Sequence, residues 1–173
     1  LQDLEDAGQS ENTIIFFYSD HGTGLPRHKR WLFDTGVKVP LIVYIPKAFK
    51  NIYPSDPGSE INRLVSFIDL APTVLNLTNA EIPSTMQGQA FLGKGLNTES
   101  EHVHIARGRM DERYDMQRGV RTKDYKYLRY YEPSKPFIQF MNTPESGPLM
   151  TELRKAQKAG ELSPEGEQLV ASV

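Results

Sequence analysis

The sequence predicts an α/β fold in which a mixed or parallel sheet, flanked by helices, is followed by a smaller antiparallel C-terminal subdomain. Two apolar runs of strand length, residues 13–18 and 39–46, flank a loop that is punctuated by glycine and proline. A helical pattern follows, and the chain from about residue 101 onward reads as short strands rich in Arg, Lys and Tyr. This order of elements favours a sheet-and-helix layer with an appended antiparallel piece.

The first half of the chain carries the larger elements. Residues 1–7 are typical of the end of a helix, stopped by Gly8. The continuous apolar runs TIIFFY (13–18) and VPLIVYIP (39–46) are typical of strands buried on both faces of a parallel sheet. Residues 64–77 are expected to form a helix, with Asp69 as an N-cap.

The second half is expected to contain smaller elements. Residues 102–106 alternate as a strand does, residues 116–131 indicate a hairpin that turns near Lys123, and residues 147–160 indicate a helix between two glycines. We therefore expect two domains, residues 1–96 and residues 97–173. Because the chain starts at Leu1 within a helical pattern, we also expect it to be a fragment whose N-terminal half is missing.

Composition excludes several classes of function. The net charge of -2 argues against a general nucleic-acid binder, and no apolar run is long enough to span a membrane. The sequence contains no cysteine, which excludes disulfides, thiolate metal sites and a cysteine nucleophile within these residues.

The first apolar run ends abruptly in Ser-Asp-His-Gly. Ligands of open α/β sheets gather beyond the carboxyl ends of the strands, where Asp20 and His21 are expected to lie. Carboxylate oxygens and imidazole nitrogens are common metal ligands, and Gly22 would let the chain turn away closely. The segment therefore suggests a metal site. The alternative is a purely local role, in which Asp20 caps the next turn and His21 bonds to nearby backbone.

A basic segment follows these two residues. Arg27, His28, Lys29 and Arg30 form a run that could hold an anion, since Arg offers a planar fork of donors and Lys a point charge. Metal and cations in one site suit the transfer of a sulfuryl or phosphoryl group, in which charge develops on oxygen atoms. A solvated basic loop is the alternative.

Taken together, these segments resemble the C-terminal part of bacterial-type sulfatases, which belong to the alkaline-phosphatase-like superfamily. The resemblance rests on TIIFFYSDHG, on HKRWLFDTGVKVPLIVYIP, on VSFIDLAPTVLNLTNAEIPSTMQGQAFL and on RGRMDERYDMQRGVRTKDYKYLRYY. These segments occur in the family's order and cover nearly the whole chain. Three positions depart from the family pattern: His21 stands where many sulfatases have Asn, His28 stands where glycine is usual, and Lys38 stands where arginine is usual.

The resemblance implies a role for each matching residue. Asp20 and His21 would bind one calcium ion, although another divalent metal is an alternative because of His21. Lys29 would be catalytic, contacting the sulfate and the leaving oxygen. Arg27, His28 and Arg30 are weaker candidates for substrate binding. The family's formylglycine nucleophile derives from a Cys/Ser-x-Pro-x-Arg motif, which these residues lack, so we expect it in the missing N-terminal half.

The implied function is that of a sulfatase fragment acting on a sulfated carbohydrate and inactive on its own. Two alternatives stay open: a phosphonate monoester hydrolase or phosphodiesterase of the same superfamily, and a non-catalytic glycan-binding relative. By analogy with the family, we expect a periplasmic or secreted protein. The sequence does not indicate an oligomeric state.

Overall fold

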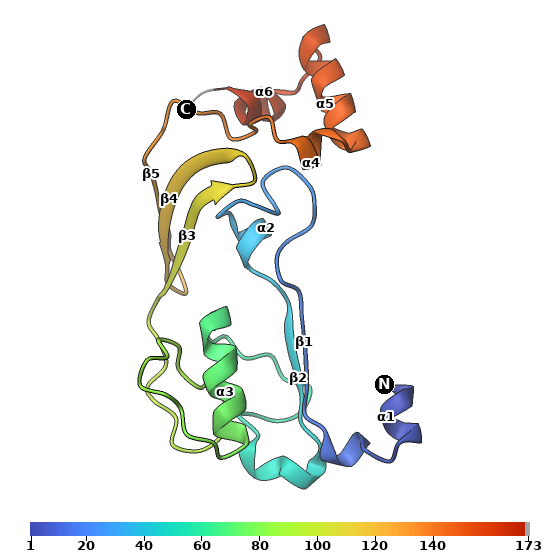
Figure 1. Cartoon of the computed structure of the whole chain (residues 1–173), viewed down its shortest axis with the longest axis vertical. Helices are drawn as coiled ribbons and strands as arrows, with labels where there is room; N and C mark the ends of the chain where they lie inside the picture. Colours follow the sequence, from blue (N-terminus) through green and yellow to red (C-terminus); the bar gives the residue numbers. More distant parts are fainter. Residues whose placement is uncertain (172–173) are drawn as a thin grey trace. The chain divides into compact units, whose positions relative to one another are not determined.

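The computed structural model describes residues 1–171 (Figure 1). No helix in this part of the chain is both long and apolar enough to cross a membrane. The chain forms two compact units, each built from several separate stretches. The first unit contains Leu1–Tyr18, Leu41–Val103 and Arg121–Tyr125, and the second contains Ser19–Pro40, His104–Val120 and the residues from Lys126 onward. The predicted division at residues 96 and 97 stays a prediction for the complete protein.

The first unit contains a two-stranded sheet. Strands β1 (Ile15–Tyr18) and β2 (Leu41–Tyr44) lie side by side and run antiparallel, with Ile15 opposite Tyr44 (Figure 1). Both strands are where the apolar runs predict them. However, the expectation of parallel pairing is wrong for these two strands, because they run antiparallel. Within the described residues they are also only partly covered, since Phe17 and Ile42 are 64% and 60% exposed. A continuous apolar run indicates a preference for burial but does not specify the direction of the neighbouring strand.

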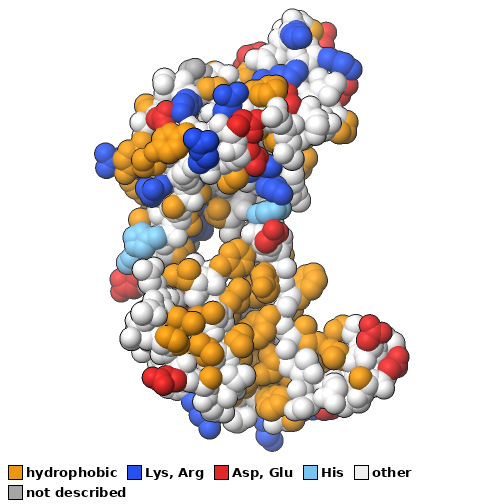
Figure 2. Space-filling model, in the orientation of Figure 1, with side chains coloured by type: hydrophobic (Ala, Val, Ile, Leu, Met, Phe, Trp, Pro, Cys, Tyr) orange, Lys and Arg blue, Asp and Glu red, His pale blue; other side chains and the backbone are white. Residues whose placement is uncertain are grey.

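Helix α3 (Leu70–Leu77) packs in the same unit, where Figure 2 shows hydrophobic side chains gathered near the sheet and this helix. It begins later than the predicted residue 64, because Phe67–Asp69 forms the 3₁₀ turn η3. The Asp69 carboxylate accepts hydrogen bonds from the backbone N–H groups of Ser66 and Gln89. Smaller elements are α1 (Gln2–Asp6) and the 3₁₀ turns η1 (Ser10–Asn12) and η2 (Lys47–Ile52).

The second unit holds most of a three-stranded sheet in the order β3–β4–β5. Strands β3 (Val103–Met110) and β4 (Arg113–Arg121) are joined by two residues, a connection that only antiparallel strands allow. Strand β5 (Lys126–Tyr130) completes the predicted hairpin. The fold class expected from the sequence, a mixed α/β arrangement with a small antiparallel C-terminal sheet, is confirmed.

Three helices follow this sheet: α4 (Asn142–Glu145), α5 (Pro148–Ala159) and α6 (Pro164–Val170). Helix α5 confirms the helix predicted between two glycines. Pro148 begins it, where a missing N–H costs nothing, and Gly160 ends it with φ of 70°, a left-handed conformation that glycine adopts without steric cost. Buried apolar side chains of this unit are Trp31, Leu32, Ile138, Met141 and Met150.

Candidate metal and anion site

Asp20 and His21 lie directly after β1, and both belong to the second unit. The His21 Nε2 atom is 3.4 Å from Asp20 Oδ2, and both side chains reach solvent. The His21 Nδ1 atom is 2.7 Å from the Gly22 carbonyl oxygen. Because a carbonyl can only accept, Nδ1 is the donor of this bond. The Nε2 atom lies on the Asp20 side, where a neutral ring would present its lone pair.

This arrangement fits a shared divalent cation. Calcium–oxygen bonds are about 2.3–2.6 Å long and zinc–nitrogen bonds are shorter, so atoms 3.4 Å apart can contact one ion. Within residues 1–171, no group of three or more His, Asp and Glu side chains could hold a metal. Asp20 and His21 could therefore supply only part of a coordination shell. Their assignment as metal ligands stays a prediction.

Two glycines pack the chain tightly next to these candidate ligands. The Gly22 N–H donates to the Gly36 carbonyl at 3.0 Å, which ties the end of β1 to the short helix α2 (Asp34–Val37). A Cβ on Gly22 would lie 1.8 Å from the Thr35 carbonyl oxygen. Gly22 is thus required because two backbone segments approach closely at this point. From the sequence alone, its expected role was to let the chain turn.

Gly36 is enclosed by the basic segment itself. A Cβ at this position would lie 2.2 Å from the His28 carbonyl oxygen and 2.3 Å from that of Trp31. These neighbours are backbone atoms, so a change of rotamer cannot relieve the overlap. The basic segment therefore keeps its path only if residue 36 has no side chain.

Gly36→Ala is expected to destabilise the second unit by about 3 kcal/mol, because the backbone of residues 28–31 must shift to admit a methyl group. Denaturant unfolding of the full-length protein measures the change. Gly24→Ala is the matched control: no atom lies within 4 Å of its new Cβ, and we expect a change within about 0.5 kcal/mol. Equal stability of the two variants would contradict the tight packing.

The basic segment is closed into a loop by Thr23. The Lys29 N–H donates to the Thr23 carbonyl at 2.9 Å, and the Thr23 hydroxyl is 2.7 Å from His28 Nδ1. Thr23 follows His21 by two positions, so these bonds return the Lys29 backbone toward the candidate metal ligands. The half-buried Lys29 side chain has no ion pair or side-chain hydrogen bond with any residue of the described part.

The two arginines of the loop are held in place by different partners. The Arg30 Nε donates to Asp111 Oδ2 at 2.9 Å, whereas the Arg27 guanidinium lies over the Phe33 ring, 4.3 Å from its centroid. Both residues have left-handed φ angles, 64° and 79°, which are costly for side chains with a Cβ. A hollow of about 390 Å³ adjoins the loop, lined by Pro26, Arg27, His28, Phe33, Asp34 and Thr35. The substrate roles of Arg27, His28 and Arg30 stay predictions.

A buried cluster beneath the loop was not predicted from the sequence. Arg107 on β3 is 3% exposed and lies over the Trp31 indole at 4.0 Å, with Nη1 3.5 Å from Asp115 Oδ2. Burial lowers the pKa of the Arg107 guanidinium, while Asp115 acts to raise it. The Asp115 carboxylate also accepts from the amides of Gln117 and Gln139. A buried charge is maintained by pairing, so this cluster fixes Trp31 and with it the end of the loop.

Lys126 on β5 anchors the far end of the same loop. Its Nζ atom is 2.7 Å from Asp34 Oδ1 and also donates to the Leu32 carbonyl, 94 residues away in the sequence. Tyr130 lies on the same strand as Lys126. The pKa of its phenol is raised, mainly because the group is buried, and the negative charge of Asp115 raises it further. The sequence signal for Arg107 and Asp115 is the alternation of β3 and β4, in which these two charged residues stand at positions of the buried face.

Comparison with known proteins gives a consistent result for the chain. Residues 26–159 match the family model described as "N-sulphoglucosamine sulphohydrolase, C-terminal". An ulvan-active sulfatase of Formosa agariphila is 42% identical over 95% of this chain and 27% of its own length. An N-acetylglucosamine-6-O-sulfatase of Bacteroides thetaiotaomicron is 31% identical over 76% of this chain and 25% of its own length.

The fold agrees as well. A solved structure of a protein in complex with its substrate D-glucosamine-2-N,6-O-disulfate matches with a TM-score of 0.64 and 25% identity. The match covers 97% of this chain and 36% of that protein. The chain thus spans about a quarter of the length of the two curated relatives above and about a third of the solved one.

Proposed function

Because the chain belongs to the N-sulphoglucosamine sulphohydrolase C-terminal family of sulfatases, we propose that it is the C-terminal part of a sulfuric ester hydrolase acting on sulfated carbohydrate. The names of the relatives support the substrate class, since they include ulvan-active and N-acetylglucosamine-6-O-sulfatases. The rest of the catalytic domain would lie outside these 173 residues. A periplasmic or secreted location is part of the same proposal.

One observation carries the proposal more than any other. Two potential metal-binding atoms, Asp20 Oδ2 and His21 Nε2, lie 3.4 Å apart, and the loop that follows brings back a lysine that has no ion-pair partner among residues 1–171. An ammonium group that makes no salt bridge keeps its full charge available for a bound anion. This combination is suited to an ester whose oxygens gain negative charge during the reaction.

Each candidate site residue would have a defined role. Asp20 and His21 would hold the cation, with the Nδ1–H of His21 fixed on the Gly22 carbonyl. The Lys29 ammonium would contact the sulfate and stabilise charge on its oxygens and on the leaving oxygen. Arg27 and His28, which line the hollow beside the loop, would contact the substrate there, and Arg30, which is paired with Asp111, would be a further candidate. A bound divalent cation would supply Lewis-acid polarisation of the sulfate ester.

Calcium is the metal we propose for this pair, because Asp20 offers a hard oxygen ligand and the family generally uses a catalytic-site metal. His21 also suits zinc or manganese, which imidazole binds more readily than calcium. We further propose that the nucleophile is the formylglycine general to the family. Its Cys or Ser precursor would lie in another part of the protein, because these 173 residues contain no Cys/Ser-x-Pro-x-Arg motif.

The test compares kcat/KM of the full-length, metal-loaded protein for an aryl sulfate, an aryl phosphonate monoester and an aryl phosphodiester. We expect the aryl sulfate to be preferred, with sulfate released from a sulfated oligosaccharide as well. Preference for phosphonate or phosphodiester would favour the alternative that His21 suggests. Specific binding of a sulfated oligosaccharide without any turnover would favour a non-catalytic relative.

A further inference from the structure

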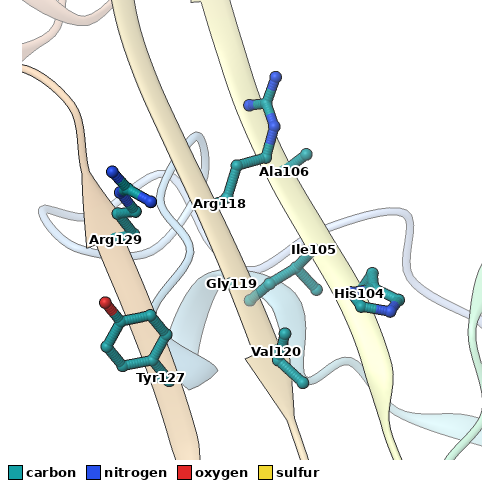
Figure 3. A pocket seen from close by; sticks show the side chains of 8 residues that line it. All are labelled: His104, Ile105, Ala106, Arg118, Gly119, Val120, Tyr127 and Arg129. Atoms are coloured by element: carbon teal, nitrogen blue, oxygen red, sulfur yellow. The ribbon is translucent and has the colours of Figure 1, made fainter.

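The face of the β3–β4–β5 sheet opposite Arg107 and Asp115 carries a second set of cations. Side chains alternate along a strand, so Arg118 on β4 and Arg129 on β5 share a face that excludes Asp115, Gln117 and Tyr130. Figure 3 shows both guanidinium groups beside a shallow hollow of about 250 Å³. Its lining contains no acidic residue: His104, Ile105, Ala106, Arg118, Gly119, Val120, Tyr127 and Arg129.

Both arginines are held in position by uncharged partners. The Arg118 Nη1 atom donates to the carbonyl oxygens of Arg107 and Gln117, each at 2.8 Å. The Arg129 guanidinium lies over the Tyr131 ring, 4.7 Å from its centroid. Neither guanidinium takes part in an ion pair with a carboxylate of residues 1–171, in contrast to Arg30 and Lys126. Their charge is therefore uncompensated, and their orientation is fixed before any ligand arrives.

An exposed aromatic ring completes this surface. Tyr127 is 67% exposed and, in Figure 3, lies along β5 below Arg129 with its hydroxyl toward that residue. A flat ring offers apolar contact to the C–H face of a sugar, while fixed guanidinium forks bind sulfate oxygens. Arg118 and Arg129 lie on adjacent strands, about 5 Å apart across the sheet, so both can contact neighbouring groups of one ligand.

We propose that this face, defined by Arg118, Tyr127 and Arg129, binds a sulfated carbohydrate chain. Charge complementarity selects a polyanion, and the exposed ring of Tyr127 next to Arg129 on β5 favours a saccharide. The choice of sulfated carbohydrate rests on the proposed function, whereas the existence of an anion-binding face does not.

The test uses the full-length protein with the substitution Lys29→Ala to prevent turnover, and measures Kd for a heparin-type hexasaccharide by calorimetry. The double variant Arg118→Gln/Arg129→Gln is expected to bind at least about tenfold more weakly, since two charge-assisted contacts are lost. Tyr127→Ala is expected to weaken binding several-fold. The binding of the unsubstituted face should weaken as ionic strength rises, because salt screens exposed charges.

Three controls make the result specific. Lys155→Gln/Lys158→Gln removes the same charge from exposed positions of α5 and should leave Kd within about twofold. Arg118→Lys/Arg129→Lys keeps the charge without the planar fork and should give an intermediate Kd. The chemically desulfated hexasaccharide should bind no better to the parent than to the arginine double variant. Unfolding temperatures should match throughout.

Unchanged hexasaccharide affinity in the folded Arg118→Gln/Arg129→Gln variant would overturn the proposal. So would an equal loss of affinity for a single-stranded oligonucleotide of the same charge, because it would indicate a general polyanion surface. The result is independent of the catalytic proposal. Aryl sulfate turnover, measured with Lys29 intact, can fail while hexasaccharide binding still depends on Arg118 and Arg129, and the reverse can also occur.

Discussion

Replacing Lys29 with alanine is expected to lower kcat of the full-length protein for an aryl sulfate by about 100-fold or more. The substitution deletes a cation where negative charge develops, and loss of one such stabilising group typically costs about 10²- to 10³-fold in rate. The side chain has no structural partner within the described residues, so little stability should be lost with it. Steady-state kinetics measures the effect.

Two further variants identify the cause. Lys29→Arg keeps the positive charge and should retain more activity than Lys29→Ala, whereas Lys47→Ala removes one charge from the exposed start of η2 and should leave kcat unchanged. Near wild-type turnover in Lys29→Ala would show that the role implied by the family resemblance does not belong to this lysine.

Replacing Asp20 with alanine is expected to reduce the metal content of the purified full-length protein from about one ion per chain to almost none. The variant removes an anionic candidate ligand and leaves only His21 at this end of the strand. Elemental analysis after dialysis measures the metal content, and it also identifies the metal. Turnover should fall in parallel.

The Asp20 result is interpreted against two other carboxylate variants. Asp20→Asn keeps an oxygen ligand without its charge, so its metal content should be intermediate. Asp3→Ala changes an exposed carboxylate of α1 and should leave metal content unaltered. Unchanged metal content in Asp20→Ala would remove this residue from the metal site.

The local elements of the fold were largely predictable from the sequence. Strands β1 and β2, the β4–β5 hairpin and helix α5 lie within about two or three residues of their predicted positions, because each has a strong local signal. The antiparallel pairing of β1 with β2 was not predictable in this way. An apolar run reports how much side-chain surface prefers burial, whereas strand direction depends on how residues 19–40 return the chain.

The candidate site was likewise predictable only in part from the sequence. The sequence placed Asp20 and His21 after a strand, and their side chains do lie together, although their roles stay predictions. It did not indicate that Arg107 and Asp115 are buried beneath Trp31, or that Lys126 bonds to Leu32 across 94 residues. Such contacts depend on which strands become neighbours, and no local pattern encodes that information.

The sequence by itself therefore determined the family resemblance, the order of elements and the identity of the side chains at the end of β1, because these depend on short and consecutive patterns. The tertiary structure decided what those side chains can do. It buried the Arg107–Asp115 pair beneath Trp31, and it closed the basic loop around Gly36. It also left Arg118 and Arg129, on one face of the sheet, without acidic partners in the part of the chain that the structure describes. These properties arise from distances between atoms of separate segments, which exist only once the chain has folded.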